Sequence, residues 1–172
     1  MASEQHTTLY DTQALTRVLD AMAARLAPQL QGATAISLVG VRRRGTPLAD
    51  MLLARLRSFL PTAPIERIDL LIKRYEDDLR LLYPDTQLTE QAQHAQMDLS
   101  GRVVVVVDDV LYQGFSLNKA VQYLLSKGGK TILTVVLVDR VCATCRRSSR
   151  RFRSCWCSRA RPDGPVDFSF LS

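Results

Sequence analysis

The sequence predicts an α/β protein with a central, mainly parallel sheet flanked by helices, and three observations support this fold class. Short apolar runs typical of buried strands alternate with segments of helical periodicity. Five consecutive valines, Val103 to Val107, form the unbroken apolar run expected of a parallel strand covered on both faces. Polar, glycine-containing loops follow two of these runs, and ligands of such sheets bind at the carboxyl ends of the strands.

Each expected element has a local signal. Asp11 can cap the first helix and Gly32 can end it, while Pro47 suits the first turn of the second helix. The polar segment Arg74–Met97, which contains Pro84, predicts a long loop flanked by short strands. Helices are expected over residues 11–31, 47–60 and 117–127, and strands over 35–41, 65–72, 103–107 and 131–138.

Length and composition favour one domain with a sizeable core, since the chain has 172 residues and is 47% hydrophobic. The net charge of +6 arises locally, because residues 141–161 carry seven arginines and no acid. The remainder is nearly neutral, so the charge does not indicate a nucleic-acid surface across the whole fold. No apolar run is long enough to span a membrane, and the polar start lacks a signal-peptide core. We therefore expect a cytoplasmic protein with reduced thiols.

The stretch from Val103 to Ser116 carries the strongest chemical signal. A buried strand leads into Asp108 and Asp109, and a glycine-containing loop then runs into a helix. Backbone N–H groups and the positive end of a helix dipole suit a phosphate. The two acids are better placed to hold sugar hydroxyls, or Mg²⁺ through water. A sugar phosphate is the simplest ligand that uses both halves, whereas the functionally neutral alternative is a strand followed by a solvated polar turn.

A second candidate loop directly follows the first expected strand. Glycines bracket three arginines here, and glycine permits a tight turn and close backbone approach to a ligand. The arginine guanidinium matches the oxygens of a diphosphate, although such a loop taken alone is most often merely solvated. The residues of this loop are Gly40, Val41, Arg42, Arg43, Arg44 and Gly45.

The string DLSGRVVVVVDDVLYQGFSLNKAV, from Asp98 to Val121, resembles the phosphoribosyl diphosphate (PRPP) signature of type I phosphoribosyltransferases. It is most similar to the branch of pyrimidine-operon regulators and uracil phosphoribosyltransferases, and the resemblance covers about residues 10–140. Gln113 stands where that branch usually has threonine, and Phe115 where it has arginine. The first departure removes a hydroxyl and the second a cation from the loop that would contact the 5′-phosphate.

The resemblance implies a role for each candidate residue. Asp108 and Asp109 would hold the ribose 2′- and 3′-hydroxyls, and the loop Gly40–Gly45 would hold the diphosphate, with Mg²⁺ bridging ribose and diphosphate oxygens. Arg74 would act catalytically from a mobile loop over the site, or belong to an ordinary charged surface loop. The residues that would hold the 5′-phosphate are Tyr112, Gln113, Gly114, Phe115 and Ser116, and those near the nucleobase are Asp139 and Arg140.

The function implied by the resemblance is transfer of phosphoribosyl from PRPP to uracil, giving uridine monophosphate (UMP) and diphosphate. One alternative is a regulator of the same fold that senses nucleotide and binds messenger RNA without turnover. Another is a purine phosphoribosyltransferase. By resemblance we also expect a homo-oligomer, with no membrane partner.

The resemblance stops after Arg140, which divides the chain into a phosphoribosyltransferase-like domain, 1–140, and an anomalous tail, 141–172. Residues 141–161 hold all four cysteines and the only tryptophan. A zinc site is one interpretation, but Cys155 and Cys157 are unusually close. An arginine-rich RNA-binding tail is a second. A shifted reading frame in a GC-rich gene is the interpretation that we prefer, and it predicts a poorly ordered tail.

Overall fold

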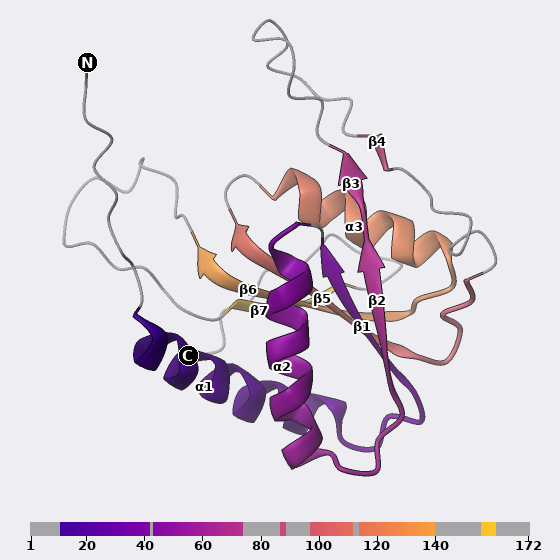
Figure 1. The fold of residues 1–172 in the computed structure, drawn as a ribbon. Helices are drawn as coiled ribbons and strands as arrows, with labels where there is room; N and C mark the ends of the chain where they lie inside the picture. Colours follow the sequence, from indigo (N-terminus) through magenta and orange to yellow (C-terminus); the bar gives the residue numbers. More distant parts are fainter. Residues whose placement is uncertain are drawn as a thin grey trace, which may run out of the picture.

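The computed structural model describes residues 11–41, 43–73, 87–88, 97–111, 114–139 and 156–160. The main sheet has the strand order β2-β1-β5-β6-β7, in which the first four strands are parallel and β7 is antiparallel to β6. The prediction of a mainly parallel sheet flanked by helices is therefore confirmed (Figure 1). The elements are α1 (Thr12–Leu30), β1 (Ile36–Val41), α2 (Gly45–Phe59), β2 (Ile65–Leu70), β3 (Ile72–Lys73), β4 (Gln87–Leu88), β5 (Val103–Leu111), α3 (Phe115–Ser126), β6 (Thr131–Asp139) and β7 (Trp156–Ala160).

The strand order places a topological switch between β1 and β5. The chain leaves β1 toward β2 on one side and leaves β5 toward β6 on the other. The crossover helices α2 and α3 accordingly cover opposite faces of the sheet, with α1 beside α2 (Figure 1). In open α/β sheets the crevice at such a switch, outside the carboxyl ends of the strands, is where ligands bind.

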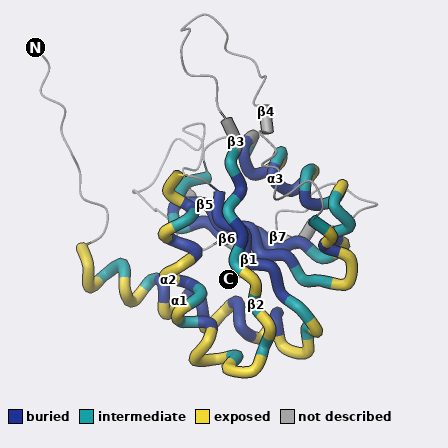
Figure 2. The backbone as a smooth tube through the Cα atoms, turned by 45° about the vertical axis from the view of Figure 1, so that its right-hand side comes forward, coloured by how far each residue is buried: buried dark blue, intermediate teal, exposed yellow. Residues whose placement is uncertain are grey.

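The core consists of two apolar layers that share the strands (Figure 2). Val105 and Val107 of β5 pack under α1 and α2, whereas Val104 and Val106 pack under α3. This is the alternation of side chains expected along a strand, and burial on both faces explains the unbroken apolar sequence.

The helix ends agree with the local signals. Asp11 caps α1 by accepting a hydrogen bond from the backbone N–H of Ala14 at 2.6 Å, and Gly32 follows the helix with φ at 77°. The second helix begins at Gly45, two residues earlier than expected, so Pro47 still lies within its first turn. Proline is tolerated there because an N–H in the first turn of a helix has no intrahelical acceptor.

Besides the start of α2, three boundaries differ by two or more residues from the sequence-based prediction. The second strand ends at Leu70, and the chain then forms β3, which pairs antiparallel with β4. The strand β4 lies within the polar segment Arg74–Met97, so the two short strands flank residues 74–86, which lie outside the described residues. The third strand does not stop at Val107 but continues to Leu111, because its pairing with β6 continues after β1 has ended. The third helix begins at Phe115 rather than Leu117.

Part of the tail that looked anomalous in sequence contributes a strand. Residues Trp156–Ala160 pair antiparallel with β6, from Val136↔Trp156 to Ile132↔Ala160. The hypotheses of a zinc site, an RNA-binding tail and a shifted frame rest mainly on residues 141–155 and 161–172, which lie outside the described residues. Among the helices of the described ranges, none has the length and apolar character needed to span a bilayer.

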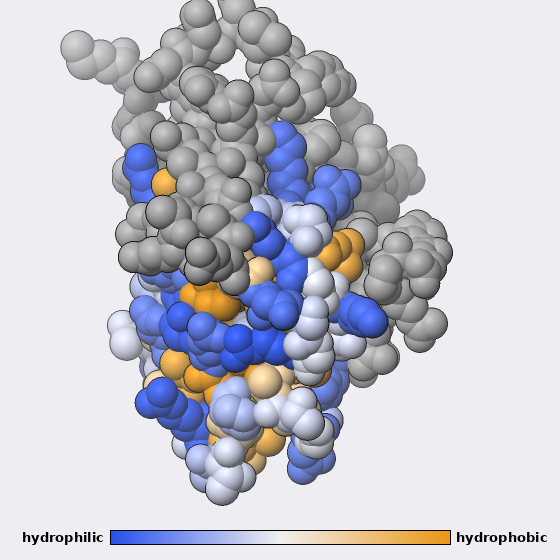
Figure 3. All heavy atoms as spheres, turned by 90° about the vertical axis from the view of Figure 1, so that its right-hand side faces the viewer, coloured by the Kyte–Doolittle hydropathy of each residue, from blue (hydrophilic) through white to orange (hydrophobic). Residues whose placement is uncertain are grey.

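The strand β2 forms one edge of the sheet and carries Glu66, Arg67 and Asp69. Charges on an edge strand discourage pairing with another chain. Figure 3 views the molecule from this side. Hydrophilic side chains form a band across the described surface, with apolar side chains above and below the band. Arg67 and Asp69 lie two residues apart in the strand and therefore share one face.

Replacing Leu52 by alanine tests the layer under α2. Leu52 is fully buried, so Leu52→Ala should lower the free energy of unfolding by about 2–5 kcal/mol. The neighbouring Met51 is 37% exposed, and Met51→Ala should change the free energy of unfolding by only about 0.5 kcal/mol. Urea unfolding of the two variants checks this difference. Equal losses would contradict the assignment of the buried face of α2.

Candidate functional site

The arginine loop follows β1 at the switch point. The strand ends at Val41, Arg43 and Arg44 form an exposed turn, and Gly45 begins α2. The first-turn N–H groups of a helix have no intrahelical acceptor, and the dipole makes this end positive. The turn thus presents two guanidinium groups beside a helix N-terminus, as a site for anions requires. Arg42 lies outside the described residues.

Gly45 packs directly against the backbone of β5. A Cβ at this position would lie 2.4 Å from the carbonyl oxygen of Val107 and 3.2 Å from the Cα of Asp108. No side chain can occupy that space without moving the backbone. The sequence reasoning assigned Gly45 to ligand approach, and the structure shows that its missing side chain also brings α2 against the strand that carries the carboxylates.

The two carboxylates lie on a strand rather than in the loop after it. Successive side chains of a strand point to opposite faces. Asp109 therefore shares the face of Val105 and Val107, toward α2, and Asp108 shares the face of Val104 and Val106, toward α3. Asp108 is 7% exposed and accepts a hydrogen bond from the backbone N–H of Asp109 at 2.9 Å.

One carboxylate meets the arginine loop directly. The Nη1 of Arg44 lies 3.6 Å from an Oδ of Asp109, and the two side chains are 84% and 27% exposed. An ion pair this exposed contributes at most about 1 kcal/mol. Arg44 can therefore exchange Asp109 for a ligand phosphate at small cost, leaving the carboxylate close to the same ligand.

The second phosphate-binding candidate is the start of α3. Gly114 adopts φ 74° at the N-cap, a left-handed conformation that favours glycine, and its carbonyl accepts the N–H of Asn118 at 2.8 Å. Ser116 is buried in the first turn. Tyr112, Gln113 and the side chain of Phe115 lie outside the description. The described part thus supplies a second helix N-terminus on the opposite face of β5 from α2.

The remaining expected site residues are only partly placed. The backbone of Asp139 pairs with Leu111 at the carboxyl end of β6, the edge where it was expected. Its side chain, together with Arg74 and Arg140, lies outside the described residues, so their roles stay predictions.

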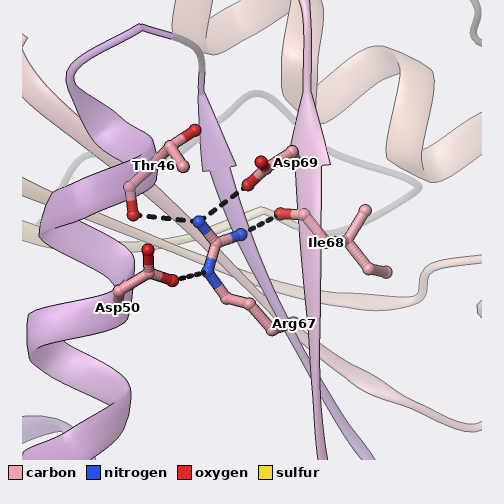
Figure 4. Close-up of polar contacts among 5 residues, drawn as sticks. All are labelled: Thr46, Asp50, Arg67, Ile68 and Asp69. Carbon is pink, nitrogen blue, oxygen red and sulfur yellow. Dashed lines mark hydrogen bonds and ion pairs between the residues drawn. The ribbon is translucent and has the colours of Figure 1, made fainter.

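Sequence reasoning missed Arg67, which binds the first turn of α2 from β2. Its Nη2 donates to the carbonyl oxygen of Thr46 at 2.9 Å, and its Nε donates to Asp50 at 2.8 Å (Figure 4). The available signal was the pair of opposite charges Arg67 and Asp69 on one face of a strand.

The described residues can share a metal ion with a ligand but do not enclose one. Within the described ranges, no group of three or more His, Cys, Asp or Glu side chains is arranged to hold a metal. Asp108 and Asp109 supply carboxylate oxygens, the ligand type that Mg²⁺ prefers. Mg²⁺ usually keeps waters and binds through one or two carboxylates plus substrate phosphates, which this donor set fits.

Gly45→Ala tests the close approach of α2 to β5. The added methyl group meets backbone rather than a movable side chain, so we expect a loss of about 1–3 kcal/mol in unfolding free energy. The melting temperature and the affinity for anions should both fall. The control is Gly32→Ala, where the methyl meets open space and only the positive φ opposes it. A Gly45→Ala variant with unchanged stability and anion affinity would show that the contact does not hold the site together.

Comparisons with known proteins agree with this geometry. The profile of the phosphoribosyl transferase domain family matches residues 5–157. Bifunctional protein PyrR of Pelotomaculum thermopropionicum is 35% identical over 136 residues, covering 77% of this chain and 72% of the relative. The protein of the same name from Actinobacillus pleuropneumoniae is 32% identical over 134 residues, with coverages of 77% and 73%.

Solved structures show the same fold. A Trypanosoma cruzi hypoxanthine phosphoribosyl transferase superposes with a TM-score of 0.67 at 17% identity, covering 88% of this chain and 76% of the other. A hypoxanthine phosphoribosyltransferase from Staphylococcus aureus gives 0.61 at 14% identity, with coverages of 86% and 74%. The match to the family profile and the relatives named bifunctional protein PyrR confirm the resemblance found in the sequence.

Proposed function

The chain belongs to the phosphoribosyl transferase domain family, and from this membership and the geometry of the site we propose that it transfers the phosphoribosyl group of PRPP to uracil. The observation that carries the proposal is the meeting of the arginine loop with the carboxylate pair at the switch point, where Arg44 lies 3.6 Å from Asp109. PRPP has a diphosphate, a ribose diol and a 5′-phosphate, and this edge of the sheet offers a group suited to each.

Each part of the substrate has a complementary element. The turn at Arg43 and Arg44, with the N-terminus of α2, suits the diphosphate, since guanidinium groups match phosphate oxygens. Thr46 lies in the same helix start, and its buried hydroxyl has no hydrogen-bond partner among the described residues. Asp108 and Asp109 suit the ribose hydroxyls, and the start of α3 suits the 5′-phosphate.

Catalysis on such a site consists of positioning and charge stabilisation. The bond between C1′ of the ribose and the diphosphate oxygen breaks, the bond between C1′ and N1 of uracil forms, and the proton of N1 leaves to solvent. The ribose carries positive charge as the diphosphate departs. Arginines at the diphosphate stabilise the negative charge of the leaving group, and carboxylates near the ribose favour the cationic ring. No covalent intermediate with the protein is needed.

Mg²⁺ is the expected cofactor. When bound together with the substrate, the ion would supply positive charge to the leaving diphosphate. Asp108 and Asp109 are the described residues that would hold it, directly or through water. Their own part is to fix the diol against the end of β5.

A nucleotide-sensing regulator that binds RNA is the second candidate. Two observations favour it: the relatives are named bifunctional protein PyrR, and the phosphate loop carries Gln113 and Phe115 where the resembling branch has threonine and arginine. Weakened 5′-phosphate contacts would favour binding over turnover. A purine is the third possibility for the substrate, because choice of base depends on residues from Asp139 onward.

Replacing both carboxylates by amides tests the proposed site. Asp108→Asn/Asp109→Asn keeps the shape of the side chains, so the fold should persist while kcat/KM with PRPP falls on the order of 10²-fold. Production of UMP from uracil, PRPP and Mg²⁺ is the assay, with hypoxanthine and guanine as competing bases. The matched control is Asp20→Asn, which removes a surface carboxylate paired with Arg55 on α2. Unchanged kinetics in the double variant would remove the assignment, and turnover of a purine instead of uracil would correct the substrate.

The dependence of RNA binding on salt separates the regulator from the enzyme. A protein that neutralises several RNA phosphates should lose affinity steeply, with a slope of about 0.7 per phosphate in a log–log plot for single strands. The regulator predicts such a slope, measured by fluorescence anisotropy, together with a change in affinity when UMP is added. Binding that is insensitive to both salt and UMP would exclude the regulator.

A further inference from the structure

Arg67 is surrounded by acceptors from two elements of the fold (Figure 4). Its Nε donates to Asp50 at 2.8 Å, and its Nη2 lies 2.8 Å from an Oδ of Asp69. The same Nη2 donates to the carbonyl oxygen of Thr46 at 2.9 Å, and Nη1 donates to the carbonyl oxygen of Ile68. One side chain therefore ties the end of β2 to the first turn of α2.

These contacts leave Arg67 little capacity to bind substrate itself. A guanidinium has five N–H donors, and the four contacts of Arg67 within the protein occupy four of them. Two carboxylates also neutralise its charge, and its side chain is only 17% exposed. Arg43 and Arg44 are exposed by contrast. Arg67 is thus built to hold protein groups rather than a phosphate.

Gly40 brings the arginine loop onto this guanidinium. A Cβ at Gly40 would lie 2.7 Å from the Nη2 of Arg67 and 2.9 Å from the Cα of Thr46. The end of β1, the start of α2 and the end of β2 therefore converge on one largely buried guanidinium group. A displacement of Arg67 removes its bonds to the carbonyl of Thr46 and to Asp50, and with them two anchors of the helix start that follows Arg43 and Arg44.

We infer that Arg67 is a positioning residue, which acts through Thr46 to hold the arginine loop and the N-terminus of α2 where the diphosphate of the substrate binds. The inference rests on the proposed function for the identity of the ligand, but not for the mechanical role. Arginine is required rather than any cation, because only a planar fork reaches a helix carbonyl, a strand carbonyl and two carboxylates together. Lysine keeps the charge and loses the geometry.

The first measurement needs no ligand. Hydrogen exchange of the backbone amides of Ala49, Asp50 and Met51, which donate to the carbonyls of the first turn of α2, should accelerate at least about tenfold in Arg67→Gln, because that turn loses an anchor. Arg67→Lys should lie between Arg67→Gln and the original protein. The matched control is Arg55→Gln, which removes an arginine that bonds Asp20 and the carbonyl of Met51 further along the same helix. Unchanged exchange in Arg67→Gln and Arg67→Lys would overturn the inference.

The second measurement separates the two phosphate sites. Calorimetry with inorganic diphosphate and Mg²⁺ should show about tenfold weaker binding to Arg67→Gln. Binding of UMP, which has a 5′-phosphate but no diphosphate, should stay within twofold of the original, as should both ligands with Arg55→Gln. Equal losses for UMP and diphosphate would mean general destabilisation and would refute a local role.

The failures of the two proposals are distinguishable. If the unmodified chain binds neither diphosphate nor UMP, the proposed function fails, while the exchange experiment still decides whether Arg67 holds the loop. If the unmodified chain binds both and Arg67→Gln binds diphosphate equally well, the function stands and the positioning role is refuted. Restored diphosphate affinity in Arg67→Lys would show that charge, and not the fork, is what the site needs.

Discussion

The close approach of two backbones at Gly45 is the constraint on which the site depends. The carbonyl oxygen of Val107 occupies the space that a side chain at Gly45 would need, 2.4 Å from where its Cβ would be. This contact is possible because β1 and β5 are adjacent and parallel, with Gly40 beside Val107. The start of α2, with its unpaired N–H groups and positive end, is thereby fixed next to the carboxylates. The register of the sheet, rather than the course of a loop, sets the distance between arginines and acids.

The alternation of side chains then divides the site between the two faces of β5. Asp109 lies toward α2 and meets Arg44, whereas Asp108 lies toward α3, whose first turn contains the buried Ser116. The ends of the two crossover helices therefore stand on opposite sides of one strand end, each beside a carboxylate. The groups of PRPP follow a matching order, with a diphosphate at one end, a 5′-phosphate at the other and a diol between them. Under the proposed function, the ligand straddles the end of β5.

The sequence allowed the fold class and the order of elements to be predicted, because periodicity and the buried valines depend on local pattern. It also allowed the arginine loop and the carboxylate pair to be chosen. It failed at the end of β5, where Asp108 and Asp109 interrupt the apolar run although pairing with β6 continues the strand. It failed likewise at Trp156–Ala160, whose strand follows from the backbone edge that β6 offers rather than from its own pattern. Both errors arise from tertiary pairing that a local pattern does not encode.

The arginines around the site show why residue type alone does not reveal a role. Arg44 and Arg67 lie near the same helix turn, and both contact a carboxylate. Among the described residues, Arg44 has one ion pair, which is long and exposed, and it can release this pair to a ligand at small cost. Arg67 is largely buried and spends its donors on two carbonyls and two carboxylates, so a ligand would have to break contacts that hold the fold. The difference between binding an anion and supporting the group that binds it lies in how many donors remain unused, a quantity that appears only when the strands and helices are assembled.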